Sequence, residues 1–380
     1  MRSTNTLFAS GQNGGKLLGL ELLRFIAAFA VLVWHYQHFA FDGTGIIVVR
    51  EQQPFYALLQ PFYEYGRYGV QVFWSISGFI FFWRYGTSVH TDLVSGSRFF
   101  VLRFSRLYPL HFATLLLVAL LQALFATLNG HYFVYPNNDP YHFLLQLFMA
   151  SNWGLQAGYS FNGPIWSISA EVLVYTIFYA CMRIIGRSLW INSIAVIFSV
   201  TLRLTDHATV FSDCIGYFYA GGIGAYMFLY DGGAGSVRIW RRLAWLTALS
   251  APIIAWPFLS AASEQTVMSA VLLYAPVFLY CIAQPLRVSP HVARMIEECG
   301  NLTYSSYLLH FPLQLLIALY FSISGRAIPM YHAPLFMFFI GVSFLAAYFV
   351  YHCFERPVQA LLRVRFGTPS VIRGKVAKHG

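Results

Sequence analysis

Long apolar runs recur from one end of the chain to the other, and short polar segments separate them. Runs of about 20 residues can cross a bilayer as α-helices. Membrane β-strands would instead alternate apolar and polar residues over about ten positions. The pattern predicts an all-α polytopic membrane protein with about ten transmembrane helices, at 17–41, 66–84, 107–128, 164–182, 189–206, 211–229, 243–261, 266–284, 301–321 and 333–353.

One further apolar stretch, 141–153, is too short to cross, and we expect a re-entrant or interfacial helix there. The first run shows no signal-peptide cleavage pattern, so we interpret it as a retained span. The predicted organisation is a cytoplasmic N-terminal segment at 1–16, a membrane domain at 17–357 and a short basic cytoplasmic tail at 358–380. Such a tail can rest on anionic membrane lipid.

The composition agrees with a membrane protein, because 58% of the residues are hydrophobic and 10% are charged. Soluble domains carry roughly 25% charged residues. Nineteen of the 24 Lys and Arg residues fall on the predicted inner segments and four on the outer ones, with Arg24 inside the first span. This asymmetry follows the positive-inside rule and predicts both termini in the cytoplasm. The net charge of +10 therefore reflects topology, and we expect no nucleic-acid partner.

The five cysteines are scattered along the chain and form no CxxC pair and no cluster with histidine. A zinc site would need such spacing. We therefore expect cysteines that act as small buried hydrophobes, and no metal ion.

The stretch RFIAAFAVLVWH places Arg24 and His35 at the two ends of an apolar run. Eleven residues make close to three helical turns, so both side chains lie on one face, separated by roughly 16 Å in depth. Ionisable residues inside a membrane helix are costly and usually functional. A neutral imidazole can accept a proton from a hydroxyl group near neutral pH.

Two arginines in RFSRLYP, Arg103 and Arg106, are neighbours on one helix face at the predicted cytoplasmic boundary. They are either ordinary positive-inside charges or a planar fork for phosphate groups.

The stretch NGPIWSISAEV places Glu171 about two turns inside the fourth predicted span, with Ser167 one turn before it and Trp166 close by. A carboxylate at that depth needs a partner, and His35 and Arg24 are the expected ones. The alternative is a purely structural hydrogen bond between helices.

Other polar residues inside spans are weaker candidates for a site. In the second span we expect Gly78 and the small residues around it, such as Ser77, to allow close helix packing. His310 lies mid-membrane in the ninth span. Glu355 is expected to pair with a basic loop, and Asp213 has no partner that can be named from the sequence.

The motifs LLRFIAAFAVLVWH, FWSISGFIFF, RFSRLYP, GPIWSISAE, SYLLHFP and FERP occur in the order seen in a known family. Over residues 17–357 the chain resembles the membrane acyltransferase type 3 family, bacterial O-acetyltransferases of surface glycans. The resemblance implies an acyl-CoA donor, usually acetyl-CoA, that enters from the cytoplasm as a substrate. It also implies a hydroxyl acceptor on an extracytoplasmic or lipid-linked saccharide, and a place in the bacterial inner membrane. The extracytoplasmic esterase-like domain of some members is not expected here.

Carried over to this sequence, the resemblance implies that His35 is the catalytic histidine and Arg24 its motif partner. It implies CoA phosphate contacts for Arg103 and Arg106, and a place in the reaction site for Glu171. His35 would act as a general base or carry the acyl group transiently, and the sequence leaves both schemes open. It does not indicate the acceptor, the acyl length or the oligomeric state.

Two other classes of protein would also place charges inside a membrane. A proton-coupled transporter or flippase would use Arg24, His35 and Glu171 as a polar path, although the two similar halves common in transporters are not evident. A glycosyltransferase with a lipid-phosphate donor would not need Arg103 and Arg106. Acetyl-CoA turnover separates an acyltransferase from both.

Overall fold

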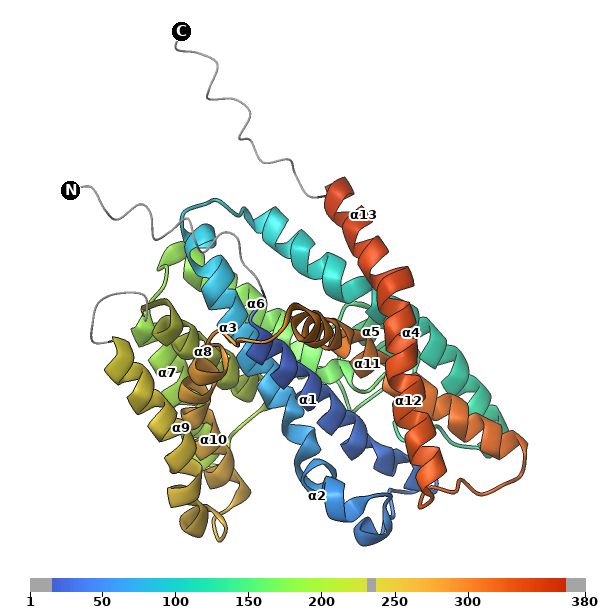
Figure 1. The fold of residues 1–380 in the computed structure, drawn as a ribbon. Coiled ribbons are helices and arrows are strands. Elements are labelled where there is room, and N and C mark those ends of the chain that lie inside the picture. The colour runs from blue at the N-terminus through green and yellow to red at the C-terminus, as the bar shows by residue number, and fades with distance from the viewer. Residues whose placement is uncertain (1–15, 231–236, 367–380) are drawn as a thin grey trace, which may run out of the picture.

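The computed structural model describes residues 16–230 and 237–366, and 78% of these residues are helical. Each predicted span overlaps a helix (Figure 1). These helices are α1 (Leu18–His35), α3 (Gly69–His90), α4 (Gly96–Asn129), α6 (Ile165–Ile184), α7 (Leu189–Leu204), α8 (Val210–Tyr230), α9 (Val237–Leu259), α10 (Glu264–Ile282), α11 (Pro290–Ile323) and α12 (Ala333–Val350).

Three shorter helices complete the fold. Two lie in the predicted outer segments, α2 (Tyr56–Tyr65) and α5 (Pro140–Leu147), and α5 confirms a short helix near 141–153. The third, α13 (Arg356–Phe366), continues α12 through the π-helical turn Tyr351–Glu355. Residues 358–366 of the predicted tail are therefore helical, whereas 1–15 and 367–380 lie outside the described residues.

The described chain contains seven helical segments long and apolar enough to cross a membrane. This confirms an all-α, multi-pass integral membrane protein. The exact number of spans and the cytoplasmic placement of both termini stay predictions. The segments are Leu18–Ala40, α4, α6, Ile239–Leu259, α10, α11 and Ala333–Phe366.

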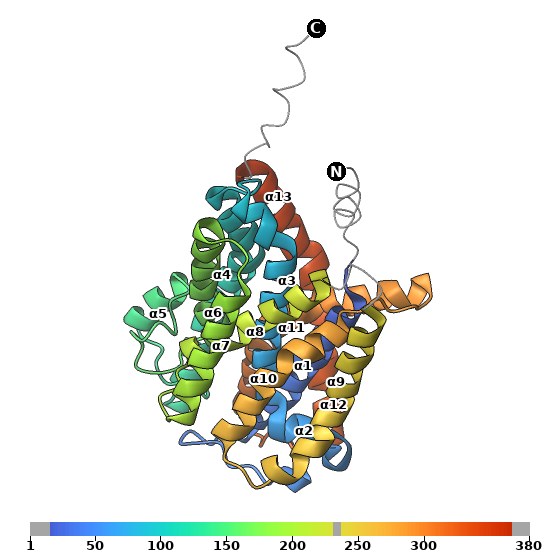
Figure 2. The ribbon, with the colours of Figure 1, turned by 90° about the vertical axis from the view of Figure 1, so that its left-hand side faces the viewer.

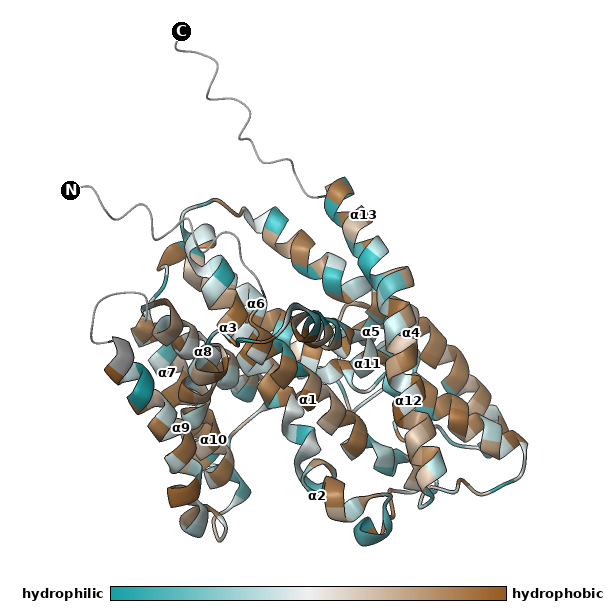
Figure 3. Cartoon of the chain, viewed as in Figure 1, coloured by the Kyte–Doolittle hydropathy of each residue, from teal (hydrophilic) through white to brown (hydrophobic). Residues whose placement is uncertain are grey.

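Hydropathy colouring distinguishes the lipid-facing helices from the polar end of the molecule. In Figure 3 brown ribbon dominates α9 and much of α4, whereas teal appears where α4 begins and along α13. On α9 the side chains of Ile253 and Trp256 are 75% and 69% exposed. Apolar surface of this kind suits a bilayer.

Two helices begin well before the spans predicted for them. α4 begins at Gly96 rather than near 107, and α11 begins at Pro290 rather than near 301. Both starts are capped, because the side chains of Ser95 and Ser289 accept hydrogen bonds from backbone amides in the first turn. Arg103 and Arg106 therefore lie within a rigid helix and not in a loop before it.

Helices α3 and α8 cross closely and lie side by side (Figures 1 and 2). A Cβ atom on Gly78 would lie 1.8 Å from the carbonyl oxygen of Phe218, and one on Gly221 would lie 1.9 Å from that of Ser75. Backbone cannot yield as a flexible side chain can. The predicted packing role of Gly78 is confirmed. The close crossing also fixes the position of the preceding residue, Ser77.

We expect Gly78→Ala to destabilise the fold by about 3 kcal/mol, because the added methyl group forces the two backbones apart. The matched control is Gly341→Ala in α12, where a Cβ atom meets nothing within 4 Å. Since alanine favours helix over glycine, the control should be as stable as the parent or slightly more so. Thermal unfolding in detergent measures both, and an unchanged midpoint for Gly78→Ala contradicts the close crossing.

Candidate active site

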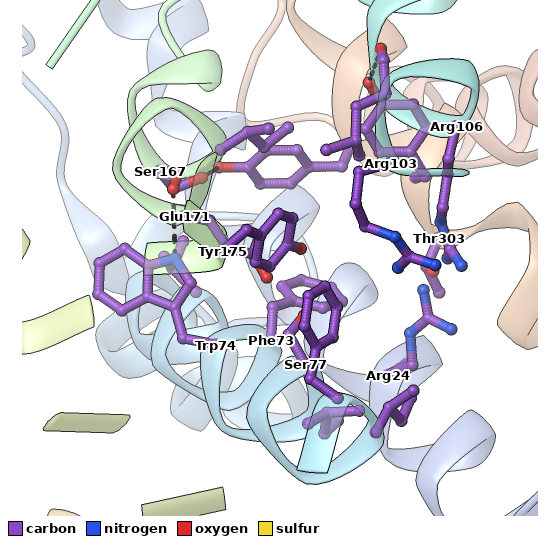
Figure 4. Close-up of a pocket in the computed structure, with 18 residues that line it drawn as sticks. Arg24, Phe73, Trp74, Ser77, Arg103, Arg106, Ser167, Glu171, Tyr175 and Thr303 are labelled. Carbon is purple, nitrogen blue, oxygen red and sulfur yellow. Dashed lines mark hydrogen bonds between the residues drawn. The ribbon is translucent and has the colours of Figure 1, made fainter. Parts of the chain in front are cut away.

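A cavity of about 820 Å³, its mouth included, lies between α1, α3, α4, α6 and α11. Eighteen residues line it, of which ten are labelled in Figure 4. The sequence candidates among them are Arg24, Ser77, Arg103, Arg106, Ser167 and Glu171. Residues from separate motifs, far apart along the chain, therefore share one internal space.

Three arginines dominate one side of this cavity. Figure 4 shows the guanidinium groups of Arg24, Arg103 and Arg106 pointing toward one another, with Trp74 and Ser167 on the opposite side. Arg103 donates from Nη2 to the hydroxyl of Tyr85 at 2.7 Å, while its buried Nε has no partner among the described residues. Three cations and one carboxylate, Glu171, line the space, so the lining favours an anionic ligand.

Glu171 is the only acidic residue of that lining, and it is buried. The hydroxyl groups of Ser77 and Tyr175 lie next to its carboxylate, and the charges of Arg106 and Arg24 act on it. Its Oε1 atom has no hydrogen-bond partner in the described part of the chain. Arg24 is thus near Glu171 as expected, whereas His35 is not among the groups that act on it. Ser77 faces the cavity, while its neighbour Gly78 packs against α8.

Two more carboxylates support the arginines from outside the lining. Glu21 lies one turn before Arg24, with Oε2 3.3 Å from Nη1 of that arginine. Glu355 is buried, accepts a hydrogen bond from the Ser305 hydroxyl at 2.5 Å, and faces the charge of Arg106. The expectation that Glu355 pairs with a basic loop is wrong. The π-helical turn after α12 rotates this side chain inward between α11 and α4.

His35 lies outside the cavity lining, in a cluster of three buried histidines. The ring of His35 is 4.7 Å from that of His310 and 4.9 Å from that of His38, measured between centroids. Nδ1 of His35 is 2.8 Å from the Val31 carbonyl oxygen, which can only accept, so Nδ1 carries the proton. Nε2 is left with a lone pair, and the ring is prepared to act as a base or nucleophile.

Gln314 fixes the geometry of this cluster. Its Nε2 donates to the backbone carbonyl of His35 at 2.8 Å, and its Oε1 accepts from Nδ1 of His38 at 3.1 Å. His38 therefore also presents a bare Nε2. Both ring nitrogens of the fully buried His310 have no partner among the described residues. No group of three or more ligands suited to a metal ion occurs in the described ranges.

Sequence reasoning missed His38 and Gln314. The signal was present, because His38 follows His35 by three residues and Gln314 follows His310 by four. Both spacings put polar side chains on one helix face inside apolar runs.

Tyr307 lies where the cavity approaches the histidines. It lines the cavity, and its ring is 5.9 Å from that of His310. Its hydroxyl donates to the Pro164 carbonyl at 2.8 Å and pairs with the Ser167 hydroxyl at 2.8 Å. Arg24 and His35 thus do not line one open track along α1. Arg24 lines the cavity and His35 does not, and Tyr307 connects the cavity lining to His310 of the histidine cluster.

Pro312 frees a backbone carbonyl in α11, one residue after Tyr307, for a contact with another helix. Pro312 has no amide proton, which leaves the Leu308 carbonyl without its helical partner. Asn162 occupies that carbonyl by donating from Nδ2 at 3.1 Å, just before the Gly163-Pro164 start of α6. The HFP and NGP motifs therefore join α11 to the start of α6.

The segment 130–164, which is predicted to face outward, places the ring of Tyr135 against the histidine cluster. Tyr135 is 5.8 Å from the ring of His38 and 6.1 Å from that of Tyr159. Burial raises the pKa of both tyrosines, so both stay neutral phenols. Trp166 does not line the cavity, and packs between Trp74 and Tyr159 at 5.8 and 6.2 Å.

The start of α5 is anchored within the same segment by a carboxylate. Hydrogen bonds from the backbone amide and the ring of His142 hold the pKa of Asp139 below its ordinary value. Asp139 also caps α5, and Nε2 of His142 accepts from the Ala157 amide at 3.1 Å. The segment is therefore tied together across 18 residues.

Asp213 has a partner that the sequence did not reveal. Its Oδ2 lies 2.5 Å from Nη2 of Arg203, and both side chains are largely buried between α7 and α8. Neither residue lines the cavity, so this ion pair is a structural tie between two helices.

Comparison with known proteins gives one finding. A family model described as an acyltransferase domain matches residues 17–353, which contain the cavity and the histidine cluster. No curated protein and no solved structure matches the chain.

Proposed function

Because this chain belongs to the membrane acyltransferase type 3 family, we propose that it moves an acetyl group from cytoplasmic acetyl-CoA to a hydroxyl of an extracytoplasmic or lipid-linked glycan. The chain is a multi-pass membrane acyltransferase. The donor, the acceptor and a place in the bacterial inner membrane belong to the proposal. The transporter and glycosyltransferase alternatives have no comparable support.

The observation that carries the proposal is the convergence of Arg24, Arg103 and Arg106 in a cavity within the helices. CoA is a strongly anionic molecule whose phosphates are not soluble in lipid. Guanidinium groups hold phosphate oxygens through paired, charge-assisted hydrogen bonds. With the phosphates held here, only the thin pantetheine arm and the acyl group need pass Tyr307 toward His35.

The histidine cluster supplies the chemistry in this proposal. Nε2 of His35 takes the proton from the acceptor hydroxyl, and the oxygen attacks the thioester carbonyl carbon. A C–O bond forms, the C–S bond breaks, and the proton passes from the imidazolium to the CoA thiolate. In the other scheme Nε2 attacks the carbonyl carbon first, a C–N bond forms, and the C–S bond breaks to release CoA as its thiolate. The hydroxyl oxygen then attacks the acyl-histidine, the C–N bond breaks to free Nε2, and the hydroxyl proton passes to the thiolate. Both schemes use the tautomer that the Val31 carbonyl fixes.

His310 has a supporting role in the histidine cluster, and Glu171 has one in the cavity. His310 is buried beside His35 and carries a ring N–H, a donor that suits the oxyanion that forms during attack. Glu171, held by Ser77 and Tyr175, orients the arginines from the opposite side of the cavity. Without a carboxylate among them, the guanidinium groups would repel one another more strongly.

The test is acceptor-dependent release of CoA by the purified protein in nanodiscs. We expect acetyl-CoA to bind and to be consumed when a crude glycan pool is added, with the acetyl group recovered as an ester on saccharide. Longer acyl-CoA molecules such as succinyl-CoA, run in parallel, define the acyl group. Folded protein that neither binds nor consumes any acyl-CoA would overturn the proposal.

A further inference from the structure

The last described helix, α13, packs against the first part of α4, where the cavity arginines lie. In Figure 1 it lies beside the first part of α4. It begins at Arg356, and the family model matches the chain only to residue 353. Nothing in the family match therefore assigns a role to this helix.

Arg363 connects α13 to the arginine motif. Its Nε donates to the hydroxyl of Ser105 at 3.3 Å, and Ser105 lies between Arg103 and Arg106 in the sequence. This bond uses one of the five donors of the guanidinium group. Four donors remain for a ligand at the same place.

The electrostatic surroundings of Arg363 favour an anion. The charges that act on it are those of Arg103 and Arg106, and the remaining group is the phenol of Tyr85. No carboxylate appears among these influences within the described part of the chain. Glu21 and Glu355 act on Arg24 and Arg106 instead. Like charges held together at a half-buried position are unfavourable unless a ligand compensates them.

We propose that Arg363 is a phosphate-binding residue of the donor site, which holds the nucleotide end of acyl-CoA while Arg103 and Arg106 hold the phosphates deeper in the cavity. This rests on the proposed function and extends it. A single donor molecule with phosphates at both ends of its nucleotide suits arginines spread over α4 and α13. The chemistry would also fit the phosphate of a lipid headgroup, so the test separates the two sources.

The test compares two donors that differ only in the nucleotide. Kinetics with acetyl-CoA and with S-acetyl-pantetheine are measured for the parent, Arg363→Gln and the matched control Arg365→Gln. Arg365 is an exposed arginine two residues further along the same helix, whereas Arg363 is half-buried. For Arg363→Gln we expect KM for acetyl-CoA to rise about tenfold, with kcat and the KM for S-acetyl-pantetheine unchanged. Arg365→Gln should leave all three constants unchanged.

Equal changes for both donors, or none, would overturn the proposal, because a phosphate contact must be specific to the nucleotide. Binding of 3′,5′-ADP gives a second readout that needs no turnover, and Arg363→Gln should weaken it by a similar factor. If wild type binds this nucleotide but consumes no thioester, the proposed function fails while the Arg363 site is still tested. An effect of Arg363→Gln seen only in nanodiscs with anionic lipid assigns the site to a headgroup and also overturns the proposal.

Discussion

His35→Ala should abolish acceptor-dependent CoA release, lowering kcat by about 1,000-fold or more, while acetyl-CoA binds as tightly as before. The position of His35 outside the cavity lining is the reason for this combination. The arginines that we propose hold the donor line the cavity, whereas His35 lies beyond Tyr307 and makes no contribution to that lining. Removing the imidazole therefore removes the proton acceptor or nucleophile without touching the donor site. Turnover assays and acetyl-CoA titrations on the same purified protein measure both quantities.

The variant His35→Gln separates a loss of chemistry from a loss of folding. A glutamine keeps roughly the size of the side chain and can still donate to the Val31 carbonyl, but it cannot accept and release a proton. It should be as inactive as His35→Ala. The control is His111→Gln in α4, a buried histidine bonded to the Gln146 carbonyl at 2.7 Å and outside the cluster. Activity that survives in His35→Gln would exclude both chemical roles of this residue.

Rapid quenching separates the two schemes that use His35. If Nε2 carries the acyl group, wild type incubated with acetyl-CoA alone should release about one CoA per enzyme and retain an acetyl group on the α1 peptide. If Nε2 only takes a proton, no CoA is released before acceptor is added. Mass spectrometry of the peptide that contains His35 reads the difference directly.

Much of this architecture follows from local sequence signals. The apolar runs predicted every long helix, because burial in lipid needs the same continuous pattern wherever the helix packs. Arg24 and Glu171 were also found, because a charge inside an apolar run is conspicuous, and Arg103 and Arg106 were found as a pair spaced for one helix face at a predicted boundary. Their meeting in one cavity could not be predicted, since it depends on how α1, α4 and α6 cross.

The residues that sequence reasoning missed are neutral or lie outside the apolar runs. Gln314 and Tyr307 carry no charge, so nothing distinguishes them from ordinary polar residues of α11 until their partners on α1 and α6 are known. Arg363 looked like one more basic residue of a tail. Only the packing of α13 on α4 brings it to Ser105. Likewise, the sequence predicted that Arg24 and His35 share a face, but it gave no indication that only Arg24 lines the cavity.

Arg106→Ala should raise KM for acetyl-CoA by about 30- to 100-fold, as expected for losing charge-assisted hydrogen bonds to phosphate in a site shielded from water. Arg106 lines the cavity beside Arg24 and Arg103. The negative charge of Glu355, which lies outside the lining, stabilises its cation. With the cation gone, Glu355 becomes a buried carboxylate without its counter-charge, and some loss of stability will accompany the kinetic effect. Equilibrium binding of acetyl-CoA in detergent, together with an unfolding scan, separates the two.

Arg106→Lys separates the loss of donor binding from the loss of stability, because lysine keeps the charge that faces Glu355 but lacks the planar guanidinium fork. It should unfold like wild type and still bind acetyl-CoA about tenfold more weakly. Arg98→Ala is the matched control, since Arg98 is an exposed arginine about two turns earlier on α4 and does not line the cavity. It should bind the donor normally. Full donor affinity in both Arg106 variants would mean that the converging arginines serve the packing of α4 and not CoA, and the donor would then have to be held elsewhere.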